Sequence, residues 1–167
     1  MIIYLRGGGV MNRFIYNSQY GEILIEGNGE SIIKIQLIDE TTDTNNLYET
    51  QLIRLAYNQL MEYFGGKRQD FDFPIDPAGT EFQNRVWNAI VKVPYGQTRS
   101  YKDIAEFIEN PKAYRAVGLA NNKNPIQIVI PCHRIIGSNK KLVGYRGGLE
   151  IKEKLLQLEK KNASLMG

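Results

Sequence analysis

Hydrophobic and polar residues alternate with a period of two along residues 13–38, which predicts β-strands. The apolar runs fall at 14–16, 22–26 and 32–37, and Tyr20-Gly21 and Gly27-Asn28-Gly29 separate them. Runs this short, joined by turn residues, are typical of antiparallel neighbours. We therefore expect a small antiparallel meander.

Helical spacing of apolar residues follows from Leu52 to Tyr63, and Gly65-Gly66 stands where a helix C-cap is expected. Residues 67–79 contain two prolines and no clear period, which is typical of a linker. We expect a first domain over residues 1–78, with its linker from about residue 67, and a second over 79–167. Nothing in the first of these indicates catalysis.

Capping signals mark the helices of the second domain. Thr80 with Gln83 and Ser100 with Asp103 predict two helix starts, and Asn110 before a proline predicts a third. The second and third of these helices are short and adjacent, which favours a helix-turn-helix that presents Tyr114. A final helix is expected over about 149–161. The residues that we expect to face inward are Phe82, Val86, Ala89, Ile90 and Val93; Ile104, Ala105 and Ile108; Ala113, Ala116, Val117 and Ala120; and Ile151, Leu155 and Leu158.

The composition is that of a globular protein, with 167 residues, 43% hydrophobic and 23% charged. One cysteine excludes an internal disulfide, and one cysteine with one histidine argues against a structural zinc site. We expect a reducing, cytoplasmic compartment. The stretch MIIYLRGGGVMNRF predicts neither a signal peptide nor a membrane anchor.

The net charge of +3 hides an asymmetry between the two halves. Residues 1–79 contain 6 Lys and Arg against 11 Asp and Glu, a net charge of −5, whereas residues 80–167 contain 15 against 7, a net charge of +8. A basic half suggests a polyanionic partner, although a solvated charged surface would look the same.

Candidate chemistry concentrates in the stretch IQIVIPCHRIIG, which holds the only cysteine and the only histidine side by side. An isolated cysteine is most often a small buried hydrophobe. A catalytic one needs a base, because the pKa of a free thiol is about 8.5. On an extended segment Cys132 and His133 would point to opposite faces, so their contact needs a turn or a bridging water.

This stretch, with Asn124-Pro125 before it and Gly144-Tyr145-Arg146-Gly147-Gly148 after it, resembles the O⁶-alkylguanine-DNA alkyltransferases, most closely over about residues 80–160. The resemblance implies an α/β (α+β) fold: a ribonuclease-H-like domain with a small antiparallel sheet and a helix, then a mostly helical, winged-helix-like domain. It implies direct repair of double-stranded DNA, in which an alkyl group moves irreversibly from O⁶-alkylguanine, or O⁴-alkylthymine, to a cysteine. The protein would act once, as a monomer, without metal, organic cofactor or membrane.

The resemblance also assigns roles to single residues. Cys132 would be the nucleophile, and a water, His133 and Glu159 would relay its proton. Tyr101 would press on the DNA backbone and bond the flipped base, and Arg115 would fill the vacated space. Asn124 would link the recognition helix to the cysteine segment. The implied pocket residues are Ile135, Tyr145, Arg146 and Gly147, and the implied DNA contacts are Arg115, Tyr114, Lys102, Gln83, Asn110 and Ser138.

Three other functions compete with this one. A non-catalytic sensor of alkylated bases would carry tryptophan in place of Cys132. A cysteine hydrolase would be expected to have a second histidine or an evident oxyanion loop, and the chain has only His133. A regulator that uses the helix-turn-helix alone would leave the PCHR segment unexplained.

Overall fold

The computed structural model describes residues 3–4 and 10–166, and the chain divides into two compact units, Met1–Ala78 and Gly79–Gly167. We call these the first and the second unit. Residues 1–2 and 5–9 of the stretch for which we predicted no signal peptide lie outside the described residues. Within the described part, none of the helices combines the length and the apolar character needed to cross a bilayer.

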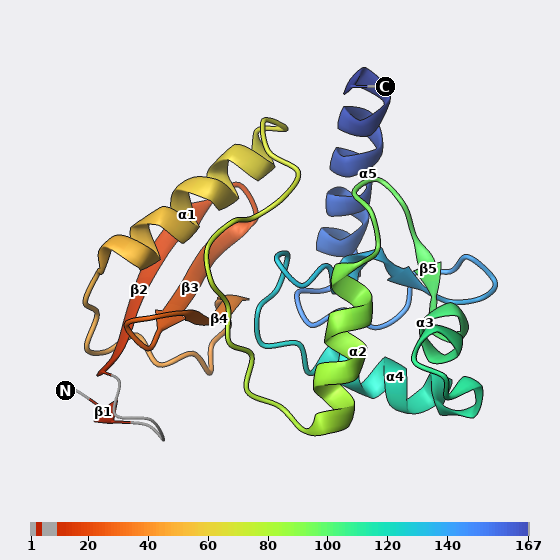
Figure 1. The fold of residues 1–167 in the computed structure, drawn as a ribbon. Coiled ribbons are helices and arrows are strands. Elements are labelled where there is room, and N and C mark those ends of the chain that lie inside the picture. Colours follow the sequence, from red (N-terminus) through yellow and green to blue (C-terminus); the bar gives the residue numbers. More distant parts are fainter. Residues whose placement is uncertain (1–2, 5–9, 167) are drawn as a thin grey trace. The chain divides into compact units, whose positions relative to one another are not determined.

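An antiparallel sheet with one helix forms the first unit (Figure 1). Its strands follow in the order β1 (Ile3–Tyr4), β2 (Val10–Ser18), β3 (Gly21–Gly27) and β4 (Ile32–Leu37), so the predicted meander is confirmed. Helix α1 (Gln51–Phe64) lies along the sheet and buries Ile53, Leu60 and Tyr63. The Thr50 side chain caps the start of α1 by accepting a hydrogen bond from the Ile53 amide. Gly65 forms the C-cap, as the sequence predicted.

The segment after α1 is part of the first unit rather than a free linker. Ile32 of β4 donates its N–H to the Pro74 carbonyl and accepts from the Asp76 N–H, both at 2.9 Å. Phe73 is buried, and the ring of Phe71 lies between those of Tyr63 and Phe73. The apolar residues of this stretch therefore extend the core of the first unit.

Helices form most of the second unit (Figure 1). Helices α2 (Glu81–Val91) and α3 (Tyr101–Phe107) have Thr80 and Ser100 as their N-caps, and both predicted capping boxes are present. After the 3-10 helix η1 (Pro111–Ala113), helix α4 (Tyr114–Asn122) packs on α3 as the second helix of the helix-turn-helix. The remaining elements are the 3-10 helix η2 (Cys132–Arg134), strands β5 (Arg99–Ser100) and β6 (Ile135–Ile136), and helix α5 (Leu149–Met166). The predicted fold class, α/β with a mostly helical second part, is confirmed.

Two helix predictions need correction. Asn110 does not cap an α-helix with its side chain, because its carbonyl accepts from the Ala113 N–H at 2.9 Å and closes the tighter turn of η1, so that α4 begins only at Tyr114. Ala116, expected inside, is exposed.

The buried stripe of α5 also differs from the prediction. Leu155 is fully buried as expected, but Ile151 and Leu158 are only half buried. The other fully buried positions are Lys152 and Glu159, one turn to either side of Leu155. These two charged side chains can lie inside because each has hydrogen-bond partners there.

A short parallel pairing connects the helix-turn-helix to the cysteine segment. Arg99 and Ser100 of β5 pair with Ile135 and Ile136 of β6. Tyr101 follows β5 directly, and η2 precedes β6 directly. The pairing therefore brings the first turn of α3 beside the segment that carries Cys132, although 31 positions separate the two residues.

Candidate active site

Cys132 begins the 3-10 helix η2 and is 3% exposed. The backbone before it is tightly wound: the Ile130 N–H bonds the Ile126 carbonyl at 3.0 Å, and Ile128 has a φ of 75°, which is rare for a β-branched residue. The segment is thus a turn and not the extended strand that would separate Cys132 from His133. Strain of this kind is held only where the surroundings stabilise it.

Asn124 supplies that support. Its Nδ2 donates to the Ile130 carbonyl at 2.8 Å and to Cys132 Sγ at 3.1 Å, and its Oδ1 accepts from the Ile126 N–H at 2.9 Å. One buried amide thus connects both ends of the turn with the sulfur. The resemblance implied a link from Asn124 through the backbone, and the structure adds the contact to the thiol.

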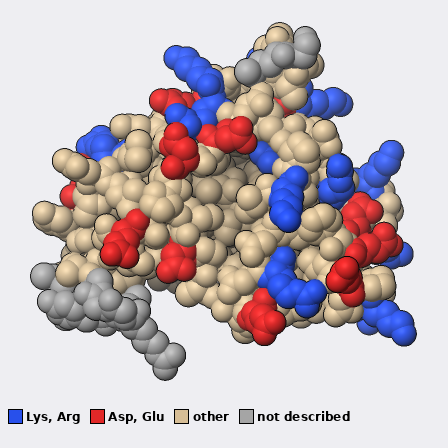
Figure 2. Space-filling model, in the orientation of Figure 1, with Lys and Arg blue, Asp and Glu red and all other residues tan. Residues whose placement is uncertain are grey.

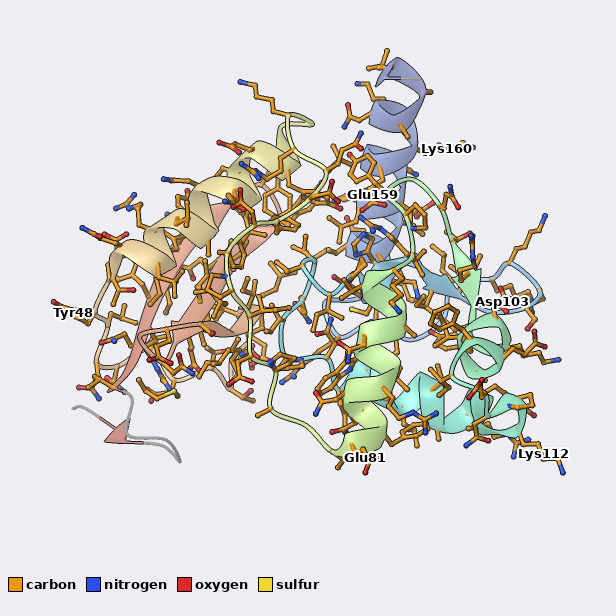
Figure 3. All side chains as sticks on the ribbon, in the orientation of Figure 1. Tyr48, Glu81, Asp103, Lys112, Glu159 and Lys160 are labelled. Carbon is orange, nitrogen blue, oxygen red and sulfur yellow. The ribbon has the colours of Figure 1, made fainter. Side chains whose placement is uncertain are left out.

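His133 and Glu159 form a buried pair, each 0% exposed. His133 Nε2 lies 2.7 Å from Glu159 Oε1. Figure 3 labels Glu159 and its exposed neighbour Lys160, which leave α5 on different sides. A carboxylate at this distance orients the imidazole and favours a proton on Nε2, so Nδ1 is the nitrogen that can accept one.

Arg134 is a third member of this cluster that the sequence analysis did not identify. Its Nε lies 2.9 Å from Glu159 Oε2, its Nη2 lies 2.9 Å from Glu159 Oε1, and its Nη1 donates to the Val93 carbonyl at 2.6 Å. The Gly96 N–H also donates to Glu159 Oε2, at 3.1 Å. The carboxylate therefore has partners on both oxygens, as a buried charge requires.

Two effects set the pKa values in the cluster: burial, and the hydrogen-bonding and charged partners that oppose it. Burial alone would raise the pKa of Glu159, but the hydrogen bonds and charges of His133 and Arg134 outweigh it and lower this pKa to about 2. Burial lowers the pKa of His133, although Glu159 opposes the shift. Glu159 is thus an anion and His133 a neutral base near neutral pH.

The thiol lies in an environment that burial dominates. Burial raises the pKa of Cys132 to about 11, while the Asn124 hydrogen bond and the charge of Lys152 oppose this shift. A nucleophilic thiolate therefore needs a base to take the proton and nearby groups that stabilise the charge. The cluster contains both.

Lys152 is a buried cation beside this site, and the sequence analysis did not identify it either. Its Nζ donates to the Ile135 carbonyl at 2.5 Å and to the Val143 carbonyl at 2.9 Å. Burial lowers its pKa to about 8. Charged residues on an amphipathic helix are usually exposed, so only its spacing to Leu155 could have indicated that Lys152 shares the inner face with Glu159.

Two tyrosines border the cluster. Tyr101, half buried, donates its hydroxyl to the Val143 carbonyl at 3.0 Å. Burial and the charge of Cys132 raise its pKa, and a hydrogen bond from Asn121 opposes the shift. Tyr145 is buried, and burial and then the charges of Cys132 and Glu159 raise its pKa well above the ordinary value. Both phenols are therefore proton-bearing groups close to the thiol.

Most of the predicted DNA contacts are exposed, unlike the residues of this cluster. Arg115, Tyr114, Lys102, Asn110 and Ser138 are all exposed, whereas Gln83 is half buried and engaged in the capping box of α2. Of the six, Lys102 and Ser138 line one surface cavity of about 600 Å³. On the face shown in Figure 2, basic side chains are interspersed with acidic ones.

Gly96 illustrates how closely this cluster is packed, and it yields a prediction. Its φ is 76°, and a Cβ added to it would lie 2.7 Å from the Cβ of Ala163. Replacing Gly96 with alanine should lower the free energy of unfolding by about 2–4 kcal/mol, from backbone strain and overpacking together. Gly148→Ala is the matched control, because its φ of 94° costs about 1 kcal/mol but its Cβ would meet open space. Urea denaturation followed by the fluorescence of Trp87, the single tryptophan, reports on the second unit, and equal losses in both variants would contradict the packing argument.

The chain is similar to known proteins over most of its length. Residues 81–161 match the family model described as 6-O-methylguanine DNA methyltransferase, DNA binding domain, and residues 11–77 match the one described as 6-O-methylguanine DNA methyltransferase, ribonuclease-like domain. The methylated-DNA--protein-cysteine methyltransferase of Methanosarcina barkeri is 47% identical over 152 residues, which cover 89% of this chain and 96% of that protein. The protein of the same name from Mycobacterium leprae is 46% identical over 147 residues, covering 86% of this chain and 89% of that protein.

Solved structures are similar as well. The crystal structure of Mycobacterium tuberculosis O6-methylguanine methyltransferase has a TM-score of 0.84 and 40% identity, and the comparison covers 94% of this chain and 99% of that chain. The structure described as Mycobacterium tuberculosis OGT in complex with DNA has a TM-score of 0.85 and 42% identity, with 90% and 94% covered.

Proposed function

Because the chain belongs to the 6-O-methylguanine DNA methyltransferase family, and so repairs DNA by transfer of an alkyl group to a cysteine, we propose that Cys132 accepts the group from an O⁶-alkylguanine flipped out of duplex DNA. The observation that supports this assignment most is the buried cluster in which Asn124 donates to Cys132 Sγ and Glu159 orients His133. No other cysteine is present in the chain.

In the proposed reaction, the thiol proton moves through a water to His133 Nδ1, and the thiolate attacks the alkyl carbon. The sulfur–carbon bond forms as the bond from that carbon to O⁶ breaks. The guanine leaves with its proton restored at N1, taken from the protonated relay, so atoms and charge balance. Glu159 stays ionised throughout and stabilises the imidazolium that forms between the two proton transfers.

The product is a thioether, and no group of the cluster would remove the alkyl group from it. We therefore propose that each molecule acts once, as a monomer, in a reducing compartment such as the cytoplasm, where its single thiol stays unoxidised. The second unit would bind DNA and carry out the transfer, and the first unit would support it. O⁴-alkylthymine is a second proposed substrate, because the reacting carbon is bonded to an exocyclic oxygen there too.

Recognition of duplex DNA would depend on the exposed side of α4. Arg115 and Tyr114 stand on its first turn, and the Arg115 guanidinium lies 5.8 Å from the centre of the Tyr114 ring. A base can reach a sulfur that is 3% exposed only after it leaves the stack, and a side chain that fills the vacated space stabilises that state. We propose Arg115 for this role.

The experiment that tests the proposed function is intact-mass analysis after incubation with duplex DNA that contains one O⁶-methylguanine. We expect a gain of one methylene, about 14 Da, which peptide mapping locates on Cys132. Binding of the lesion without a mass gain would indicate the sensor function instead. Failure to bind it would contradict the proposal altogether.

Replacing Arg115 with alanine tests base flipping separately. We expect repair of duplex DNA to slow by about 10–100-fold, while reaction with a free O⁶-alkylguanine base changes by less than about 2-fold, because only the duplex requires extrusion. Lys112→Ala is the control, since Lys112 is an exposed cation of η1 just before α4. It should weaken DNA binding through lost phosphate attraction alone. Equal losses on duplex and free base in the Arg115 variant would remove its proposed role.

A further inference from the structure

Asn121, in the last turn of α4, is a buried polar residue that the proposed mechanism does not use. It is 2% exposed. Its Nδ2 donates to the carbonyl oxygen of Cys132 at 3.4 Å, a long hydrogen bond to the backbone of the nucleophile itself. Because a carbonyl oxygen can only accept, this contact identifies the nitrogen of the amide and leaves Oδ1 as its other atom.

The Oδ1 atom of Asn121 is buried and has no hydrogen-bond partner among the described residues. Buried acceptors without a partner are rare, because water is lost and nothing replaces it. The hydroxyl of Tyr145 is a second buried polar atom without such a partner in the described part of the chain, and the charge of Cys132 acts on it too. A ligand with an N–H group bound beside Cys132 would supply the partner that Asn121 Oδ1 lacks.

Asn121 also acts on the hydroxyl of Tyr101. The Asn121 amide lowers the pKa of this hydroxyl against the effect of burial, and the hydroxyl donates to the Val143 carbonyl at 3.0 Å. The Val143 carbonyl also accepts from Lys152. Asn121 is therefore close to both the backbone of Cys132 and the hydroxyl of Tyr101.

The ligand must offer a hydrogen-bond donor to this acceptor. Alkylation at O⁶ holds the guanine ring in the form without a hydrogen on N1, and N3 and N7 are acceptors. The only N–H groups of the flipped base are then those of its 2-amino group. O⁴-alkylthymine has none, since its N3 also loses its hydrogen.

We propose that Asn121 Oδ1 accepts a hydrogen bond from the 2-amino group of the flipped O⁶-alkylguanine, and that it is a specificity-determining residue for guanine over thymine lesions. This inference rests on the proposed function. A site built to bond an N–H group rejects the analogue that lacks it, because its buried acceptor then stays unpaired.

The test pairs a deletion in the protein with a deletion in the substrate. Single-turnover rates are measured on duplexes that contain O⁶-methylguanine or O⁶-methylhypoxanthine, which lacks only the 2-amino group. The wild-type protein should favour O⁶-methylguanine by about 10-fold or more. Asn121→Leu keeps the side-chain volume and removes the acceptor. Its rate should fall by about 10-fold on O⁶-methylguanine and by less than about 2-fold on O⁶-methylhypoxanthine. The ratio of the two rates should therefore fall to about 1. Asn121→Ala should lose the rate preference for O⁶-methylguanine in the same way. Alanine favours the helix, and this variant does not depend on how a leucine packs.

Asn88→Leu, on an exposed position of α2, is the matched control and should keep the wild-type preference. Equal losses on both duplexes in the Asn121 variants would overturn the inference, as would an unchanged preference. A wild-type protein that reacts equally with both duplexes would overturn it without any variant. Failure of the wild-type protein to take the methyl group from either duplex would overturn the proposed function, which is a different result.

Discussion

Replacing Cys132 with serine is expected to abolish alkyl transfer while DNA binding stays unchanged. The hydroxyl is far less acidic than a thiol, and His133 cannot generate enough alkoxide to replace the thiolate. The rate should fall by at least about 10⁴-fold, as when an enzyme loses its nucleophile. The substitution is nearly isosteric and keeps a group that accepts from Asn124 Nδ2, so the turn before Cys132 should keep its conformation.

Intact mass measures the transfer, and a gel-shift titration with the same methylated duplex measures binding. The wild-type protein should gain the methyl group, and the serine variant should bind the lesion without a gain. A methyl group found on any other residue of the variant would show that Cys132 is not the acceptor. Loss of binding together with transfer would instead indicate that the fold of the second unit had changed.

Replacing Glu159 with glutamine should reduce both stability and activity, because one carboxylate serves two buried partners. Arg134 loses its counter-ion, and removing one member of a buried ion pair costs about 3–5 kcal/mol. His133 loses the acceptor that orients its ring, so alkyl transfer should slow by about 10²–10³-fold. Urea denaturation followed by Trp87 fluorescence measures the first effect, and the single-turnover methylation rate measures the second.

The pH dependence of stability separates this cluster from surface charges. The folded pKa of Glu159 is about 2, below its ordinary value of 4.5. The charged form therefore stabilises the fold above about pH 4.5, and this contribution is lost as the pH falls towards 2. The Glu159→Gln variant should lack this loss, so its stability should approach that of the wild-type protein at low pH. Glu153→Gln, an exposed change on the same helix, should follow the wild-type curve, and a constant gap between wild type and Glu159→Gln would contradict the assignment.

Local signals in the sequence located most helix starts correctly. Thr80 and Ser100 begin α2 and α3 because a capping box is closed by atoms three residues apart and needs no other part of the chain. Asn110 failed as a cap because a proline after it suits a 3-10 turn as well as an α-helix. In α5, hydrophobic spacing identified Leu155, and the family resemblance pointed to Glu159, but neither indicated Lys152, since spacing alone does not show which polar side chains find partners.

Some features of the site could likewise be predicted from the sequence, and others could not. The adjacency of Cys132 and His133, and their family motif, could be read directly from the chain. Arg134 was part of the motif, yet nothing local indicated that its guanidinium bonds both oxygens of a carboxylate 25 positions away. Asn121 carried no signal, because an asparagine near the end of a helix is ordinary. Its Oδ1 becomes notable only when burial removes the water that would otherwise bond it.

By itself, the sequence determined the fold class, most helix starts, the candidate nucleophile and the family, because each is encoded by residues close together or by a motif of fixed spacing. The tertiary structure alone decided that Cys132 lies in a tight turn held by Asn124, that Arg134 shares the Glu159 carboxylate with His133, and that Lys152 and Asn121 face the same interior. The physical reason is that the charge state and the unmet hydrogen bonds of a buried group depend on which distant segments exclude water from it and which supply its partners.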